Sequence, residues 1–396
     1  MHLRYFRRQR RHKLTKTART MTWIQVQFYL PEILFSLFAL SALVQLFYYL
    51  WFFRRLAWFK PVRKIQTQEH PVSVIICARD EDENIARNLP GVLVQKYSST
   101  HEVIVVNDNS VDDSKYILQE LKKTFKFLNV IELTQEAKLI DGKKYPLSIG
   151  IKEAKYEVVL LTDADCVPAS EYWIQKMQDG YDSNVEIVLG YGAYHKRPGI
   201  LNKLIRFETF HSAIQYLSFA LAGSPYMGVG RNLSYTRDIF IRNKGFASIN
   251  HIPSGDDDLF INKVATRSNT AVVLEPEAIT LSHPKTTFSA WMKQKKRHYT
   301  TARYYKVKHK LLLGMYTGSQ FIFYPLLIAG ALLFDWRLMA AIWGIKLLVQ
   351  GIIYFKVMKR MNESDLWPLF ILLDIWMFFY YIIFAPSLWK KARKIW

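Results

Sequence analysis

The sequence predicts an α/β protein with a doubly wound, mostly parallel sheet and flanking transmembrane α-helices. Two observations lead to this prediction. Between residues 71 and 165, short apolar runs rich in β-branched residues alternate with helical patterns, an order that predicts helices on both faces of a parallel sheet. Outside this region, four apolar segments reach the length needed to cross a bilayer.

Four buried strands are predicted, over residues 71–78, 102–108, 129–133 and 157–165. Apolar residues at helical spacing predict helices between them, over 80–95, 112–125 and 142–155. Ligands of doubly wound sheets bind beyond the carboxyl ends of the strands. Three of the four strands end there in polar residues, which predicts one shared crevice lined by Arg79, Asp80, Asn107, Asp108, Asp163 and Asp165.

The apolar segments predict about four membrane spans. Residues 33–53 and 311–334 carry no charge, whereas 338–355 contain Lys346 and 366–389 contain Asp374. The first segment is too long and too aromatic for a signal peptide and is interpreted as an anchor. The expected organisation is a basic tail (1–27), a transmembrane helix (28–55), a cytoplasmic sheet domain (70–284), a basic amphipathic interfacial segment (285–310), about three transmembrane helices (311–389) and a basic tail (390–396).

The net charge of +21 comes largely from residues that flank these spans. The first twenty residues hold eight basic side chains and no acid, and residues 285–310 hold nine and no acid. This distribution disfavours a nucleic-acid-binding protein and favours contact with anionic lipids. The positive-inside rule predicts a multi-pass protein of a bacterial cytoplasmic membrane with residues 54–310 in the cytoplasm. The basic residues at both ends oppose this orientation, and a start at Met21 would remove the first conflict.

Two other sequence features narrow the function. Cys77 and Cys166 lie in or beside predicted strands, with no disulfide or metal spacing, and are expected to be small core residues in a reducing compartment. The first strand is followed by neither GxGxxG nor GxxxxGK[ST], which disfavours a dinucleotide oxidoreductase and a P-loop NTPase.

The run VVLLTDADC ends a predicted strand with two acids, Asp163 and Asp165. Two carboxylates at positions i and i+2 of a turn can bind one Mg²⁺ or Mn²⁺ ion, which would neutralise a diphosphate as it leaves. The alternative interpretation is a solvated turn rich in aspartate, because this short pattern is frequent by chance.

In their order along the chain, several motifs resemble the membrane-embedded form of the inverting family 2 glycosyltransferases, which have a GT-A fold. The resemblance covers about residues 70–300 and the flanking spans. It rests on PVSVIICARDEDENI, VIVVNDNSVDDS, GKKYPLSIGI, TDADC, SGDDDLF and QKKRH. Three positions depart from the family pattern: Asn107 replaces an acid, Ser148 replaces an asparagine and His298 replaces a tryptophan.

This resemblance implies the site. The metal ligands would be Asp163 and Asp165. The general base would be Asp257, with Asp256 as the second choice, although the three acids 256–258 alone also suit a helix N-terminus. The implied acceptor-side residues are Gly230, Arg231 and His298. The implied donor-binding residues are Ala78, Arg79, Glu81, Asp108, Lys143, Asp163, Gln294 and Arg297.

Three further segments are given structural expectations. Residues 199–223 predict either a core helix or an interfacial helix that presents a lipid acceptor. Residues 227–235 are expected to form a strand that bears Gly228 and Gly230. Residues 285–310, taken alone, also suit an interfacial helix that binds lipid phosphates. His211, His251 and His283 are interpreted as structural residues, because no spacing supports a metal site.

The sequence therefore predicts a metal-dependent inverting glycosyltransferase of envelope polysaccharide biosynthesis. It would use a nucleotide-diphosphate sugar, expected to be UDP-linked, and a lipid-linked or glycan acceptor, with membrane lipids and further pathway subunits as partners. A processive polysaccharide synthase is the nearest alternative, although the replacement of tryptophan by His298 favours single addition. A non-catalytic, nucleotide-binding membrane scaffold is the alternative from a different class.

Overall fold

The computed structural model describes residues 29–61, 69–134 and 142–389. The predicted basic tails, 1–27 and 390–396, lie outside the described residues. The described chain forms two compact units. One contains residues 48–313 with the chain from Gly351 onward, and the other contains the chain up to Phe47 with Gly314–Gln350.

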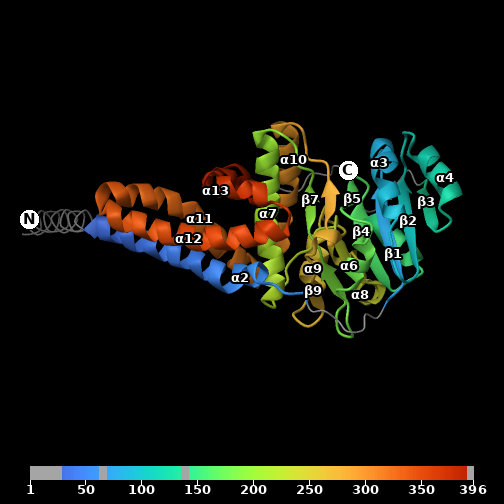
Figure 1. Cartoon of the computed structure of the whole chain (residues 1–396), viewed down its shortest axis with the longest axis horizontal. Coiled ribbons are helices and arrows are strands. Elements are labelled where there is room, and N and C mark those ends of the chain that lie inside the picture. The colour runs from blue at the N-terminus through green and yellow to red at the C-terminus, as the bar shows by residue number, and fades with distance from the viewer. Residues whose placement is uncertain (1–28, 62–68, 135–141, 390–396) are drawn as a thin grey trace, which may run out of the picture. The chain divides into compact units, whose positions relative to one another are not determined.

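A seven-stranded sheet forms the centre of the larger unit, in the order β3-β2-β1-β4-β8-β6-β9 (Figure 1). Its parallel half contains β1 (Val72–Ala78), β2 (His101–Asp108), β3 (Leu128–Leu133) and β4 (Val158–Asp163). β8 (Leu233–Thr236) is antiparallel to β4 and to β6 (Ile187–Leu189), and β9 (Thr270–Val272) is parallel to β6. The four predicted strands and their parallel order are confirmed, with ends that differ by one or two residues.

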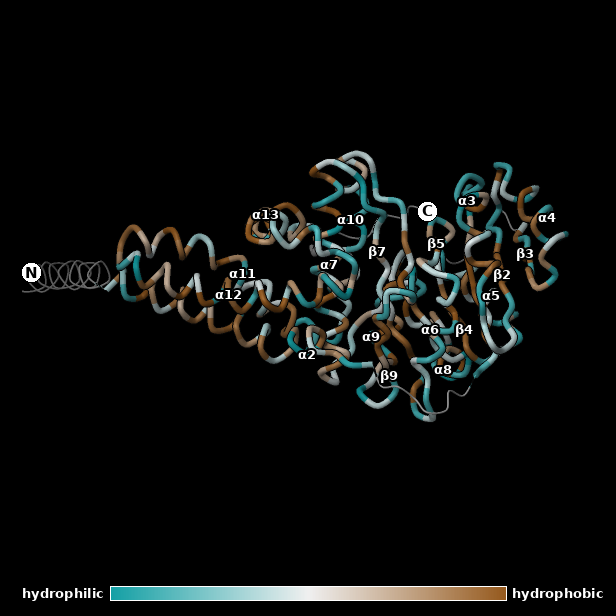
Figure 2. The backbone as a smooth tube through the Cα atoms, in the orientation of Figure 1, coloured by the Kyte–Doolittle hydropathy of each residue, from teal (hydrophilic) through white to brown (hydrophobic). Residues whose placement is uncertain are grey.

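Helices cover both faces of the parallel half, as predicted. These are α3 (Asp82–Leu93), α4 (Ser114–Thr124) and α5 (Lys144–Glu153). Alternate residues of β1 point to opposite faces, so Val74 and Ile76 join the core that contains residues of α3 and α4. Ile75 faces α5, where Gly150 allows close packing: a Cβ atom there would lie 2.7 Å from Ile75 Cγ2. These buried strands are strongly hydrophobic (Figure 2).

A second sheet of three short strands was not predicted. β10 (Thr280–Ser282) lies between β5 (Cys166–Pro168), to which it is antiparallel, and β7 (Gly192–Tyr194), to which it is parallel. Each strand has only three residues, too few to show a hydrophobic period in the sequence. Because β5 begins directly after Asp165, this sheet fixes the segment that follows the paired acids.

Five further helices of the larger unit come between or after these strands in the chain. They are α6 (Trp173–Gln178), α7 (Ile200–Leu221), α8 (Arg237–Arg242), α9 (Asp258–Val264) and α10 (Phe288–Tyr299). Most of α7 is buried, including polar residues such as Glu208 and His211. Of the two interpretations of residues 199–223, this burial favours the core helix.

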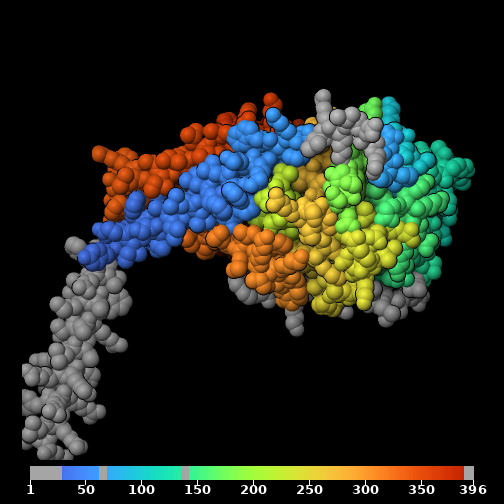
Figure 3. All heavy atoms as spheres, turned by 90° about the horizontal axis from the view of Figure 1, so that it is seen from below, coloured from blue at the N-terminus to red at the C-terminus, as the bar shows by residue number. Residues whose placement is uncertain are grey.

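Four described helices are long and apolar enough to cross a membrane. They cover Tyr29–Ala57, α11 (Val307–Leu333), α12 (Trp336–Arg360) and Ser364–Ser387, the last including α13 (Phe370–Phe384). The first contains a π-helical segment, Tyr48–Phe53, followed by α2 (Arg54–Ala57). In the smaller unit, Phe38 and Ala42 pack against Phe323 and Met339. Leucines such as Leu40 and Leu43 face outward, and Figure 3 shows the side chains of the first helix (blue) along its outer side.

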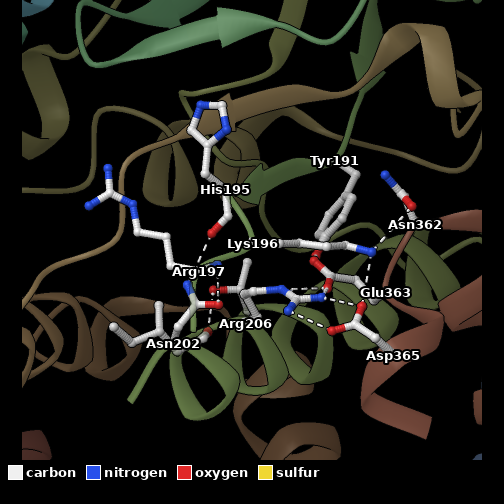
Figure 4. A network of polar contacts seen from close by, with 11 residues as sticks. Tyr191, His195, Lys196, Arg197, Asn202, Arg206, Asn362, Glu363 and Asp365 are labelled. Atoms are coloured by element: carbon white, nitrogen blue, oxygen red, sulfur yellow. Dashed lines mark hydrogen bonds and ion pairs between the residues drawn. The ribbon is translucent and has the colours of Figure 1, made fainter. Parts of the chain in front are cut away.

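A buried arginine joins α7 to the turn between α12 and α13 (Figure 4). Arg206 Nε donates to Glu363 Oε2 at 2.8 Å, and its Nη1 donates to Asp365 Oδ2 at 2.8 Å. Both Arg206 and Glu363 have side chains only 2% exposed. Tyr191 donates to Glu363 Oε1 at 3.2 Å, and Lys196 pairs with Asp365 at 2.9 Å.

Replacing Arg206 by methionine should lower the free energy of unfolding of the larger unit by about 3–5 kcal/mol, because it leaves Glu363 buried without its partner. The measurement is urea-induced unfolding of the detergent-solubilised protein. The control is Arg242→Met, which removes an arginine that is 47% exposed and should cost less than about 1 kcal/mol. Equal costs for the two variants would contradict this account of the network.

Candidate active site

The turns after β1 and β2 are joined at the carboxyl edge of the sheet. Asp80 N–H donates to Ser110 Oγ at 2.9 Å, and Val111 N–H donates to Asp80 Oδ1 at 2.8 Å. Asp80 and Asn109 have φ angles of 53° and 54°, a left-handed conformation that Asp and Asn tolerate better than most residues. The predicted crevice therefore has a fixed wall on this side.

The predicted donor residues on this wall differ in their exposure. Ala78 and Asp108 are completely buried, which leaves Asp108 no exposed surface for a ligand. Arg79 is partly exposed beside Asp80. Burial raises the pKa of Glu81, and the charges of Asp165 and Asp163 act in the same direction. The Glu81 carboxyl group is therefore coupled electrostatically to the paired acids.

Asn107, which replaces an acid of the family pattern, is held within the fold. Its Nδ2 donates to Glu132 Oε2 of β3 at 2.8 Å, and its Oδ1 accepts from Ser110 Oγ at 2.5 Å. Ser148, the second departure, donates its hydroxyl to Lys144 O one helical turn earlier. Both departures therefore have structural roles in this chain.

The paired acids lie at the end of β4 and in the turn before β5. Ligand atoms of Asp163, Asp165 and Cys166 lie within 4.8 Å of one another. Ser282 Oγ donates to Asp165 Oδ2 at 3.1 Å, and Cys166 Sγ donates to Asp165 Oδ1 at 3.2 Å. Burial and the nearby carboxylates raise the pKa of the Cys166 thiol well above its usual value, so it stays protonated. The two carboxylates suit an oxygen-seeking divalent cation, and Cys166 orients one of them.

Lys143 forms an ion pair with Asp163. It is the N-cap residue of α5 and follows Gly142, whose φ of 78° starts the turn. Burial alone would lower the pKa of Lys143, but the charges of Asp163 and Asp256 outweigh burial and raise it. Burial alone would likewise raise the pKa of Asp163, but Lys143, Arg231 and Arg297 together lower it. Asp163 is therefore ionised, and it lies among three cations that are also able to bind phosphate.

Three consecutive acids, Asp256, Asp257 and Asp258, lead into α9. Gly255 makes the turn before them with a φ of 98°. Asp257 is the N-cap residue: its Oδ1 accepts from Asp258 N–H at 2.7 Å and its Oδ2 accepts from Gly230 N–H at 2.9 Å. Burial, together with the charges of Asp256 and Asp258, raises the pKa of Asp257 to about 7. Such a carboxyl group is able to accept a proton near neutral pH.

Asp258 has a different role from Asp257. Its Oδ2 accepts hydrogen bonds from Thr301 Oγ1 at 2.5 Å and from the Tyr305 hydroxyl at 2.8 Å. Both donors lie just after α10, the helix that carries the predicted residues Gln294, Arg297 and His298. Asp258 therefore fixes the end of α10 beside the three acids. Arg297 and His298 are exposed, and the Arg297 charge reaches Asp163.

The prediction of a glycine-bearing strand over 227–235 was wrong. β8 begins only at Leu233, and Gly228 and Gly230 lie in the segment before it. Gly228 packs against Leu233 and Leu189, so a side chain there would clash, and the amide of Gly230 bonds Asp257 instead of a neighbouring strand. The predicted acceptor-side residue Arg231 lies with its guanidinium 4.4 Å from the centre of the Tyr194 ring.

Sequence reasoning missed several residues that shape this site. Tyr194, Ser282 and Cys166 come from three-residue strands, and Thr301 and Tyr305 are isolated polar residues in a basic segment. Lys295, beside the predicted Gln294, is buried and forms an ion pair with Glu208 of α7. A lysine within a basic run gives no sequence signal of burial, so only the structure identifies this pair.

Two models of known protein families match the part of the chain that contains this site. A model described as Glycosyl transferase family 2 matches residues 73–242, and a model described as Glycosyl transferase family group 2 matches residues 158–386, more than half of the chain. The chain is a family 2 glycosyltransferase. Both matches include β4 and the paired acids, and the second also includes Asp256, Asp257 and Asp258 at the start of α9.

Part of the chain is also similar in sequence to individual curated proteins. Residues of the chain are 31% identical over 144 positions to poly-β-1,6-N-acetyl-D-glucosamine synthase of Staphylococcus epidermidis, covering 36% of the chain and 32% of the relative. The synthase of Staphylococcus aureus (strain COL) is 28% identical over 140 positions, with 35% and 32% covered. The chain thus matches about a third of the length of these curated relatives.

A solved structure supports the fold. The mannosyltransferase PcManGT from Pyrobaculum calidifontis, in complex with GDP-Man and Mn²⁺, aligns with a TM-score of 0.54 and 18% identity. The alignment covers 89% of this chain and 99% of the mannosyltransferase. The predicted fold class, a GT-A-like α/β fold with apolar flanking helices, is confirmed.

Proposed function

We propose that this glycosyltransferase moves a sugar, with inversion, from a nucleotide-diphosphate donor to a hydroxyl of a lipid-linked or glycan acceptor at the membrane. The observation that carries the proposal is one constellation of charges. The carboxylates of Asp163 and Asp165 lie beside the Lys143 ammonium group, and the Arg297 charge also reaches Asp163. Asp256, next to Asp257, acts electrostatically on Lys143.

Asp163 and Asp165 would hold Mg²⁺ or Mn²⁺. The ion would neutralise the departing nucleoside diphosphate. Lys143 and Arg297 would bind the diphosphate, with Gln294, Arg79 and Glu81 as further donor-side contacts. The mannosyltransferase of similar fold, whose described complex contains GDP-Man and Mn²⁺, supports a nucleotide sugar and a divalent metal.

Asp257 would act as general base. Its carboxylate would accept the proton of an acceptor hydroxyl while that oxygen bonds to the anomeric carbon and the bond to the diphosphate breaks. One displacement inverts the configuration and needs no covalent intermediate. Asp256 is the competing base, because its charge acts on Lys143 and Cys77 on the donor side. The raised pKa of Asp257 favours Asp257.

A UDP-sugar is the proposed donor, and UDP-N-acetylglucosamine is the first to test, because the curated relatives are named for a polymer of N-acetylglucosamine. Gly230, Arg231 and His298 would line the acceptor side. We propose that the sheet domain faces the cytoplasm, since basic residues 54–64 and 285–310 flank the apolar helices. The synthases are named for a polymer, but only about a third of each is matched. Polymer formation is therefore the second candidate and not the first.

The experiment is nucleoside diphosphate release by detergent-purified protein with Mn²⁺ or Mg²⁺ and a panel of nucleotide sugars. Release from one donor by the wild type and loss of release in Asp257→Asn would support the transferase and identify its donor. Metal-dependent nucleotide binding without release, even with lipid-linked acceptors added, would support the scaffold. Long products formed from a single priming event would support a processive synthase.

The pH dependence of turnover gives a further prediction. Because the pKa of Asp257 is about 7, the base is protonated and inactive below that pH. We expect kcat/KM to fall by about tenfold per pH unit below pH 7 and to be level above about pH 8. Asp163, whose pKa is lowered, stays ionised over this range. Initial rates between pH 5 and 9 test this, and a rate that stays level down to pH 5 would exclude Asp257 as the titrating base.

A further inference from the structure

The three-stranded sheet brings two histidines next to Asp165. In the register of β10, Ser282 pairs with Cys166 of β5 and with Tyr194 of β7. One residue further, this register sets His283 between Asp165 and His195. Two contacts agree with it: Ser282 Oγ donates to Asp165 Oδ2, and the rings of His195 and His283 stack with centroids 4.6 Å apart. The charge of Asp165 also acts on His283.

A buried asparagine fixes the loop that follows β7 (Figure 4). Asn202 Nδ2 donates to His195 O at 3.0 Å, and its Oδ1 accepts from Arg197 N–H at 3.0 Å. Lys196, between them, pairs with Asp365. Arg197 is thereby held so that its Nη2 lies 2.9 Å from His283 Nδ1.

This contact sets the tautomer of His283. A guanidinium group only donates hydrogen bonds, so Nδ1 of His283 must accept. The imidazole is then neutral, and its proton is on Nε2. With Nδ1 occupied and Nε2 protonated, His283 offers no lone pair to a metal ion. It offers instead a neutral N–H donor, on a ring supported by the His195 ring.

We propose that His283 is a donor-binding residue whose Nε2–H donates a hydrogen bond to an oxygen of the nucleotide sugar beside Asp165. This inference rests on the proposed function and adds a contact to the same site. The oxygen belongs either to the diphosphate or to the transferred sugar, and both offer the acceptor that Nε2–H requires. Arg197 acts through His283 as a positioning residue.

The test compares His283→Gln, His283→Asn and His283→Ala. The amide nitrogen of glutamine can reach the position of Nε2, whereas asparagine reproduces only the position of Nδ1. The control is His70→Gln, before the amino end of β1 and therefore far from the carboxyl edge of the sheet. Titration calorimetry of the detergent-solubilised full chain would measure the Kd of Mn²⁺ alone, of UDP with Mn²⁺ and of UDP-N-acetylglucosamine with Mn²⁺.

We expect His283→Ala and His283→Asn to weaken binding of UDP-N-acetylglucosamine by about fivefold to tenfold, the value of one hydrogen bond. His283→Gln should stay within about threefold of wild type, and Mn²⁺ affinity should not change. Equal weakening of UDP binding would assign the contact to the diphosphate, and unchanged UDP binding would assign it to the sugar. Arg197→Met should reproduce part of the loss.

Four results would overturn the inference. A loss of Mn²⁺ affinity in every His283 variant would make His283 a metal ligand, and equal loss in the glutamine and alanine variants would leave it only a packing role. Wild-type affinity for UDP-N-acetylglucosamine in all three His283 variants would show that His283 does not contact the donor. If the wild type itself binds none of a panel of nucleotide sugars, the proposed function fails, and the inference fails with it.

Discussion

Replacing Asp257 by asparagine is expected to lower turnover by about 10²- to 10⁴-fold, the contribution of a positioned general base. Donor and metal binding should be unchanged, because Asp257 bonds Gly230 N–H and Asp258 N–H, away from the metal-binding carboxylates. Asparagine is also a good N-cap residue, so α9 should remain folded. The measurement is nucleoside diphosphate release at saturating donor, with nucleotide binding followed in parallel.

The matched control is Asp238→Asn, which removes a carboxylate that is 61% exposed on α8 and should leave the rate unchanged. Asp256→Asn separates the two candidate bases. If Asp256→Asn abolishes turnover with binding intact while Asp257→Asn remains active, the base is Asp256, and the shifted pKa of Asp257 has only a structural cause.

Replacing Asp165 by asparagine is expected to raise the Mn²⁺ concentration needed for half-maximal activity and to lower the rate by about 10²-fold or more. One charged ligand is lost, whereas Ser282 can still hold the side-chain oxygen. The measurement is the dependence of the initial rate on Mn²⁺ and Mg²⁺ concentration.

Lys143→Met provides the contrast for this prediction. It removes the partner of Asp163 and a proposed diphosphate contact, so it should weaken donor binding while leaving metal binding intact or tighter. Asp165→Asn should have the reverse pattern. An Asp165→Asn protein with the metal dependence of wild type would contradict the assignment of the paired acids.

The parallel half of the sheet could be predicted from sequence because each of its strands is a buried apolar run, and alternation with helices leaves few topologies. The paired acids followed from their position at a strand end. The antiparallel half and the three-stranded sheet could not be predicted, since strands such as Cys166–Pro168 and Thr280–Ser282 are too short to show a pattern.

The site was predictable only where polar residues directly follow apolar strands. From the sequence, His283 is interpreted as structural because no spacing supports a metal site. Its neighbours, Asp165, His195 and Arg197, are remote in sequence and come together only through sheet register. The prediction of a strand at Gly230 was wrong for a similar reason. Two glycines beside an apolar run indicate close backbone approach, but only the structure shows that the approach is to Asp257 and not to another strand.

The proposed function requires that the two acids at the end of β4 hold a divalent ion that binds the donor diphosphate. Crystals of the full chain grown with Mn²⁺ and UDP, measured at the manganese absorption edge, test it most directly. We expect one strong anomalous peak within about 2.3 Å of a carboxylate oxygen of Asp163 or Asp165, adjacent to both UDP phosphates. Bound UDP with no such peak, or with the peak at other residues, would contradict it.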